Sequence, residues 1–364
     1  MGIRGHFVGF VLMLGVAAAD DAAETDPHVE FTTAYNAYRE AMEASQYATA
    51  VLHAEQARAL GEQVFADNDE VRATLALNHG LALSEAGLKS AAYTVLKEAR
   101  QPVEQVFGRE SERFFQLEMT LFSNAPRDAA SRHLTSMLKL ARLHYPEDSE
   151  SMAMIKLHGG SPAWWDHRAR GLLREAAATF SRSGQAELEA RAAFYIGKID
   201  IGLDQYRNAV EAMTRVVDAL PADDTMALMA HANLVDAYER LGESERATKH
   251  CLAIGRTTPW GGTADYQPLF KRPPTYPRAA QVRGLEGYVL VEFTVDRMGF
   301  VRDPSVVDSG VSTKRGPVVS EYIADFETAA IKAAREFRYA PKFVDGKPDS
   351  VDGVRNLIRF ELRN

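Results

Sequence analysis

This 364-residue sequence contains a few histidine, serine and cysteine residues whose side chains could take part in catalysis or metal binding. The segment 158–161, His-Gly-Gly-Ser, combines a base with a hydroxyl, but Gly-Gly-Ser followed by Pro is first of all a turn signal. His144, His158 and His167 lack the spacing of a metal site. The lone Cys251 cannot form an internal disulfide, and its place on an apolar helix face predicts a small core residue. We interpret none of these residues as catalytic or metal-binding.

Established catalytic signatures are missing from the sequence. It holds no His-Glu-x-x-His, no Cys-x-x-Cys, no phosphate-cradling glycine loop with lysine, and no nucleophile elbow. The formal net charge of −8 argues against a nucleic-acid partner. Residues 263–364 carry 16 Lys and Arg against 14 Asp and Glu, so the excess of acid lies in the first 262 residues. The sequence therefore predicts a non-enzyme without cofactors.

The C-terminal quarter has the clearest pattern of elements. Gly287–Asp296 alternates apolar and polar residues with a period of two, which predicts a half-buried strand. An Asp-Arg-Met-Gly turn follows, and Phe300–Val307 can return antiparallel. Apolar residues at spacings of three and four predict a helix over Ser320–Glu336. With a last strand at Val354–Leu362, the order predicts a three-stranded antiparallel sheet covered by one helix, an α+β domain.

The last strand has two chemically different sides. Its inward-facing side is expected to hold Asn356, Ile358, Phe360 and Leu362. The other side, away from the helix, is expected to hold Arg355, Leu357, Arg359 and Glu361.

Residues 267–364 resemble the TonB C-terminal domain family. The resemblance depends on the order and spacing of several short pieces. These are Pro274–Pro277 (Pro-Thr-Tyr-Pro), Gly284–Gly287, the strand Val289–Val295 ending in Asp-Arg-Met-Gly, the helix Phe326–Ala334, Phe337–Pro341 and Ile358–Leu362.

The resemblance implies a way of binding protein. In this family a short segment of a partner adds as a strand beside the last strand, because unpaired backbone groups at a sheet edge accept another chain. Carried over, this implies a partner-binding site at Val354, Arg355, Leu357, Arg359 and Glu361, with Tyr276 and Pro277 near the start of the domain. The alternative is that the charged side chains only protect an exposed edge from aggregation.

The implied partners follow from the same family. They are protein partners, with outer-membrane TonB-dependent receptors and peptidoglycan as candidates, and pairing of two copies through this edge would give a homodimer. The chain lacks the long Pro-rich spacer of TonB itself.

The preceding region is alanine-rich, helical in period and internally repetitive. Small residues recur at positions 50, 92, 209 and 247, each within a helix–turn–helix pattern that resembles the tetratricopeptide repeat. We predict six units at intervals of about 38 to 42 residues, including poorer units at Glu110–Tyr145, broken at Pro126, and at Ser149–Ser183, broken at 159–162. Stacked units of this kind form an α-solenoid whose groove often binds peptides or proteins, although many solenoids are only spacers.

The first residues read as a targeting signal. Arg4 precedes an apolar run of 13 residues, Phe7–Ala19, and the run ends in three alanines before Asp20. The run is shorter than the roughly 20 residues of a membrane-spanning helix. We therefore expect a cleaved signal peptide and a periplasmic protein, with an uncleaved inner-membrane anchor as the alternative.

These patterns give one domain organisation and three functional hypotheses. The expected domains are a signal peptide at 1–19, helical repeats at 28–256, a linker at 257–272 and the TonB-like domain at 273–364. The favoured function is partner docking in the cell envelope, linked to energy-coupled outer-membrane transport. The alternatives are a membrane-anchored energy transducer and a structural envelope adaptor that transmits no force.

Overall fold

A computed structural model describes residues 26–161, 167–258, 261, 266–313, 316–318 and 321–362, and the predicted signal peptide at 1–19 lies outside them. The chain forms two compact units, Met1–Trp164 and Trp165–Asn364. In the described residues, no helix has the length and apolar character needed to cross a membrane. The domain boundaries expected from the sequence stay predictions.

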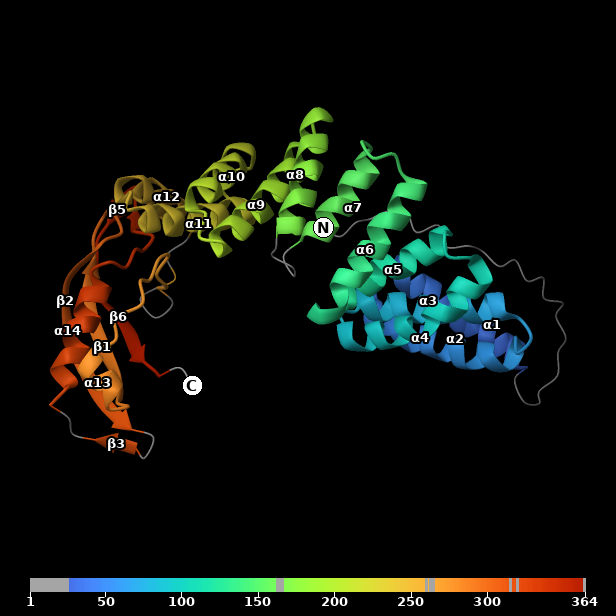
Figure 1. Ribbon diagram of the computed structural model, residues 1–364, viewed down its shortest axis with the longest axis horizontal. Coiled ribbons are helices and arrows are strands. Elements are labelled where there is room, and N and C mark those ends of the chain that lie inside the picture. The colour runs from blue at the N-terminus through green and yellow to red at the C-terminus, as the bar shows by residue number, and fades with distance from the viewer. Residues whose placement is uncertain are drawn as a thin grey trace. The chain divides into compact units, whose positions relative to one another are not determined.

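Between Pro27 and Thr257 the described residues form helices joined by short connections, and within each unit successive helices pack as hairpins (Figure 1). The six predicted repeats each correspond to two helices, with α7 in the first unit and α8 in the second. The helices are α1 (Pro27–Glu43), α2 (Tyr47–Val64), α3 (Asp69–Glu85), α4 (Lys89–Phe107), α5 (Glu112–Asn124), α6 (Arg127–His144), α7 (Glu150–Gly160), α8 (His167–Arg182), α9 (Ala186–Gly202), α10 (Tyr206–Ala219), α11 (Thr225–Leu241) and α12 (Ser244–Thr257).

Local sequence signals explain where these helices begin and end. Ser111 and Asp224 cap α5 and α11, because their side-chain oxygens accept the backbone N–H groups of Phe114 and Met226 at 3.1 and 2.7 Å. Gly242 ends α11 with φ of 75°, a left-handed conformation that suits glycine. The four repeated small residues, Ala50, Ala92, Ala209 and Ala247, are all fully buried, which lets paired helices approach closely.

The helix break predicted at 159–162 is present but begins two residues later, because α7 continues to Gly160; Pro162 lies outside the described residues. His158, Gly159 and Gly160 belong to α7, and the helix ends only at Ser161, whose N–H donates to the carbonyl of His158. Both glycines are buried, so packing overrides their poor helix propensity. The imidazole of His158 contacts the hydroxyl of Ser123 in α5, with Nε2 2.8 Å from Oγ.

The C-terminal sheet has four strands among the described residues, one more than predicted. Its order is β3-β2-β1-β6, with every neighbouring pair antiparallel. The additional strand is the short β3, which extends the β2 hairpin because β2 continues past the predicted end at Val307. The strands are β1 (Glu286–Val295), β2 (Val301–Thr313), β3 (Gly316–Val318) and β6 (Val351–Phe360).

A second, smaller hairpin lies before β6. It joins β4 (Lys342–Val344) to β5 (Lys347–Asp349), where the sequence predicted only a loop. Asp345 and Gly346 form its two-residue turn with φ of 49° and 74°. Two consecutive positive φ angles are typical of the tight turns that match the twist of paired strands.

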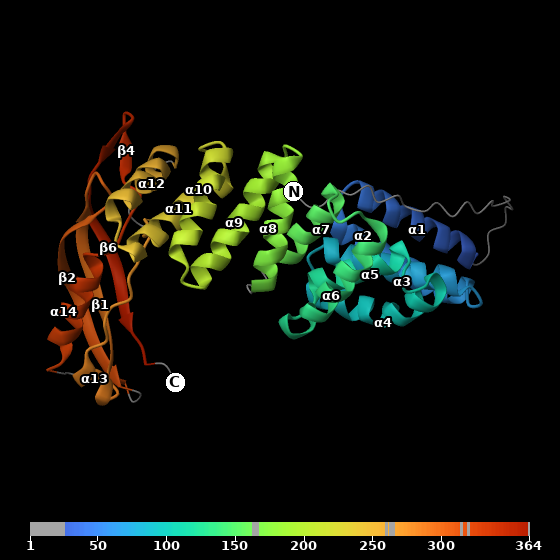
Figure 2. The same cartoon turned by 45° about the horizontal axis from the view of Figure 1, so that its top comes forward.

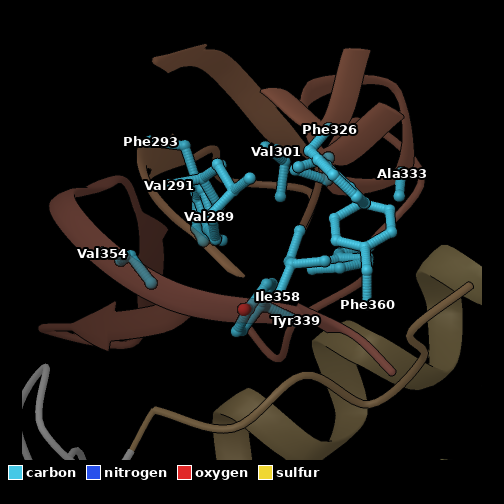
Figure 3. Close-up of a cluster of buried hydrophobic side chains, with 14 of the residues drawn as sticks. Val289, Val291, Phe293, Val301, Phe326, Ala333, Tyr339, Val354, Ile358 and Phe360 are labelled. Atoms are coloured by element: carbon cyan, nitrogen blue, oxygen red, sulfur yellow. The ribbon is translucent and has the colours of Figure 1, made fainter. Parts of the chain in front are cut away.

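One helix and the sheet enclose the core of this domain. α14 (Ile323–Ala334) packs on β1 and β2, and the short α13 (Arg278–Val282) precedes β1. Figure 3 shows Phe326 of α14 with Val289 of β1 and with Ile358 and Phe360 of β6 in one cluster of buried side chains. The predicted covering helix is thus present, although shorter than Ser320–Glu336.

Candidate protein-binding edge

β6 lies at one edge of the sheet. It pairs with β1 on one side, and within the described residues no strand pairs with its other side. Val354–Phe360 faces Gly287–Phe293 in unbroken register. A register shift follows between Phe293 and Val295, opposite Gly353, whose φ is 69°. The regular, straight part of this edge is therefore Val354–Phe360.

Three of the predicted site residues lie on the exposed face of that stretch. Arg355, Leu357 and Arg359 are all exposed and alternate with buried residues, as the period of two predicts. The Nε atom of Arg355 donates to Glu292 on β1 at 2.7 Å; the side chain of Arg355 is exposed and that of Glu292 is partly exposed. Arg359 has no carboxylate partner in the part of the chain that the structure describes. Among the described residues, this face therefore presents one unpaired cation, one exposed apolar residue and one ion pair.

Val354 and Glu361 differ from these three. The side chain of Val354 is fully buried in the core, so only its backbone is available to a partner (Figure 3). Glu361 is exposed and follows the end of β6. Just beyond it, the N–H of Leu362 donates to the carboxylate of Glu286 at 3.0 Å, which fastens the end of the chain to β1.

Tyr276 and Pro277 support the domain from within. The hydroxyl of Tyr276 donates to the carbonyl of Leu285 at 2.5 Å, and its ring meets Phe326 and Phe360 edge-on at 5.9 and 5.8 Å. Burial, together with the charge of Glu286, raises the pKa of the Tyr276 hydroxyl. Pro277 is half-buried at the start of α13. The structure therefore brings Tyr276 against the end of β6 as a packing residue.

Sequence reasoning missed one contact to β6. The ammonium of Lys271 donates to the side-chain oxygen of Asn356 at 2.8 Å and lies 5.4 Å from the ring centre of Phe337. Partial burial lowers the pKa of Lys271. A polar residue, Asn356, in the inward row of the last strand was the signal for such a partner. The segment leading into the domain thus contacts β6 through this pair.

Metal-ligand clusters and the lone cysteine are the remaining candidates for chemistry. No group of three His, Cys, Asp or Glu side chains there is close enough together to hold a metal ion. Cys251 is buried, as predicted, and burial raises the pKa of its thiol to about 11, which keeps it protonated and unreactive.

Comparison with known families identifies the C-terminal quarter. Residues 272–362 match the family described as Gram-negative bacterial TonB protein C-terminal. The protein TonB of Pseudomonas aeruginosa is 34% identical over 84 residues. That match spans 23% of this chain and 21% of the Pseudomonas protein.

Solved structures resemble the chain more distantly. A Rap protein crystallised with competence and sporulation factor covers 63% of this chain and 75% of its own, at 17% identity and a TM-score of 0.40. A putative kinesin light chain of Podospora anserina with nearly identical TPR-like repeats covers 63% of this chain and 95% of its own, at 14% identity and a TM-score of 0.29. BtubC from P. vanneervenii covers 70% of this chain and 98% of its own, at 12% identity and a TM-score of 0.28.

Proposed function

We propose that the protein docks a partner protein by β-strand addition along β6. The observation that carries this proposal is the position of β6 at the sheet edge, with a regular stretch at Val354–Phe360. On the outer side of an edge strand, backbone N–H and C=O groups have no strand to pair with, and an extended segment can take up those hydrogen bonds.

Side chains along the edge would give such docking its selectivity. A partner strand beside β6 lies next to Arg355, Leu357 and Arg359, which project from the face opposite the core. The cation of Arg359, which has no carboxylate partner among the described residues, can pair with an acidic side chain, and Leu357 offers apolar contact. The inward-facing Val354 and Ile358 keep the strand in register on the core.

The setting of this function is part of the proposal. The match to TonB C-terminal domains supports a place in the cell envelope and a link to energy-coupled outer-membrane transport. TonB-dependent receptors are the proposed partners, and the helical repeats are proposed as a second protein-binding scaffold. The protein is non-catalytic and periplasmic in this proposal.

Site-specific photo-crosslinking in envelope extracts of a Gram-negative bacterium tests the docking edge. A photoreactive phenylalanine replaces Leu357 in the full chain, and the matched control carries it at Val307 on β2. The two positions are similarly exposed, at 38% and 45%. We expect a protein adduct from position 357 and none from position 307. Equal adducts at both positions, or none from 357, would overturn docking at β6.

Two further readouts separate the related hypotheses. If the adduct contains a TonB-dependent receptor, the transport link stands, whereas an adduct with other envelope proteins alone favours an adaptor. N-terminal sequencing of the mature protein decides between signal and anchor. A mature N-terminus at or near Asp20 excludes the membrane-anchored transducer.

A further inference from the structure

Arg338 is the largest fully buried side chain in the described part of the protein. It follows α14, is 1% exposed, and points from the sheet domain toward the last helix pair. A buried guanidinium needs a counter-charge and acceptors for its N–H groups, because removing it from water is costly. The groups that pair with Arg338 therefore indicate its structural role.

On one side, these partners belong to the helices. Nη1 forms a buried ion pair with Glu239 of α11 and donates to the carbonyl of Ser244 at 3.3 Å. Nη2 donates to the hydroxyl of Thr248 of α12 at 2.8 Å. A single side chain of the C-terminal domain thus satisfies groups on both helices of the last pair.

On the other side, the same residue is fastened to the sheet domain. Nη2 also donates to the carbonyl of Met298 at 3.1 Å, and the guanidinium lies 3.7 Å from the ring centre of Phe300. The backbone of Arg338 exchanges hydrogen bonds with the segment Leu269–Phe270, which leads into the domain. The next residue, Tyr339, donates its N–H to the carbonyl of Gly299, in the turn between β1 and β2, at 3.0 Å.

Close packing surrounds this contact. A Cβ atom at Gly255 of α12 would lie 2.2 Å from the carbonyl oxygen of Pro341, so the helix and the start of the β4–β5 hairpin touch backbone to backbone. Phe270 packs with Val235 of α11 and Cys251 of α12 in one buried cluster. Figure 2 shows α12 beside β4.

We propose that Arg338 locks the sheet domain onto α11 and α12, so that the two open as one cooperative unit. In this proposal the sheet domain covers the apolar side of the last helix pair, where a further repeat would stack. A continuous set of contacts runs from β6 through β1 and its turn with β2 to Arg338 and the helices. A partner docked at β6 is therefore held at a fixed orientation to the last repeat, and this use of the lock rests on the proposed function.

Native-state hydrogen exchange on the full chain, without any partner, tests the lock. The variants are Glu239→Gln in α11 and Thr248→Val in α12, both outside the sheet domain. We expect amides of β1 and of residues 338–340 to exchange roughly tenfold faster in Glu239→Gln and by a smaller factor in Thr248→Val. Conversely, Arg338→Met is expected to speed exchange in α11 and α12.

Arg272→Met is the matched control, because its pair with Glu336 lies within the sheet domain and is about half exposed on both sides. It should leave α11 and α12 within about twofold of the unmodified protein. If the helix variants open α11 and α12 while the sheet amides keep their rates, the lock is refuted. That result would leave docking at β6 untouched, since crosslinking from position 357 measures docking separately.

Discussion

Two Arg–Glu pairs, each with its arginine in the C-terminal domain, share their chemistry and differ in their surroundings. Arg338 and Glu239 have side chains 2% and 9% exposed, whereas Arg355 and Glu292 are 60% and 36% exposed. The first pair joins the sheet to the last helix pair, and the second spans β6 and β1 at the free edge. The two pairs have the same residue types, so burial decides their roles. A buried pair acts as a fixed structural contact, whereas an exposed pair can separate and bind another partner.

The physical reason is the cost of removing charge from water. A buried ion pair has already lost its hydration, so deleting one partner leaves an uncompensated charge. A solvated pair gains little, because water and salt screen the attraction. Arg355 can therefore leave Glu292 for a docked strand at small cost, while Arg338 cannot leave Glu239.

The largest expected effect comes from breaking the buried pair. Arg338→Met should lower the free energy of unfolding by about 3–5 kcal/mol, because Glu239 is left buried without its counter-charge. Urea denaturation of the full chain measures the loss. The double variant Arg338→Met with Glu239→Leu should recover a large part of it, since neither charge then remains. The exposed control Arg272→Met should lose less than about 1 kcal/mol. An equally small loss in Arg338→Met would contradict the difference between the buried and the exposed ion pair.

Two glycines in helices, Gly255 and Gly197, test how closely the sheet domain packs on α12. Gly255→Ala should cost about 2 kcal/mol, because the new methyl group meets the backbone oxygen of Pro341 at 2.2 Å and the hairpin must shift. Gly197→Ala in α9 is the control. There the methyl group meets only the flexible side chain of Met213, at 2.8 Å at closest, and alanine favours the helix by about 1 kcal/mol. Thermal denaturation of both variants checks the ranking, and equal losses would contradict backbone contact at the hairpin.

The two faces of the last strand could be predicted from sequence because their signals are local, whereas its position at the sheet edge was implied by the family resemblance. Strict alternation placed Arg355, Leu357 and Arg359 outward and Ile358 and Phe360 inward, and the burial pattern confirms this. Helix pairs were equally visible, since small residues such as Ala209 mark close helix approach. The extra strand β3 was missed because three residues are too few to show a period.

The junction could not be predicted, because its partners are distant in the sequence. Arg338 stands 99 residues after Glu239 and 90 after Thr248. Within the segment Phe337–Pro341 it appears as an ordinary polar residue between aromatic ones. No local pattern states that a guanidinium will be buried, since burial there depends on two helices and a turn meeting around it. The contact of Lys271 with Asn356, 85 residues later, was hidden for the same reason.

Asp296, a carboxylate of intermediate exposure, extends the comparison of buried and exposed charges to the pH dependence of stability. Burial favours the neutral form of Asp296, but the backbone N–H groups of Phe300 and Met298 and the charge of Arg302 outweigh it, so its pKa is lowered. A lowered pKa in the folded state contributes stability above the unfolded value of about 4, and that stability is lost as the pH falls through the folded pKa. Asp296→Asn should therefore cost about 1 kcal/mol at neutral pH and progressively less in acid.

Urea midpoints at several pH values measure this difference. The exposed Asp303→Asn is the control and should show little effect at any pH. A loss in Asp296→Asn that is constant with pH would mean that its hydrogen bonds, rather than its charge, stabilise the turn between β1 and β2.

Arg355→Gln is expected to have the smallest effect on stability and a large effect on docking. Arg355→Gln should change the free energy of unfolding by less than about 1 kcal/mol, because its pair with Glu292 is solvated. If the edge receives a partner strand, the same change should reduce the adduct formed from position 357, whereas Arg272→Gln should not. If the charge only protects the edge, adduct formation stays unchanged and light scattering rises, because a less charged edge strand pairs more readily with another copy. Measuring adduct yield and light scattering on the same samples decides between these roles, because loss of docking lowers the adduct yield and loss of protection raises the scattering.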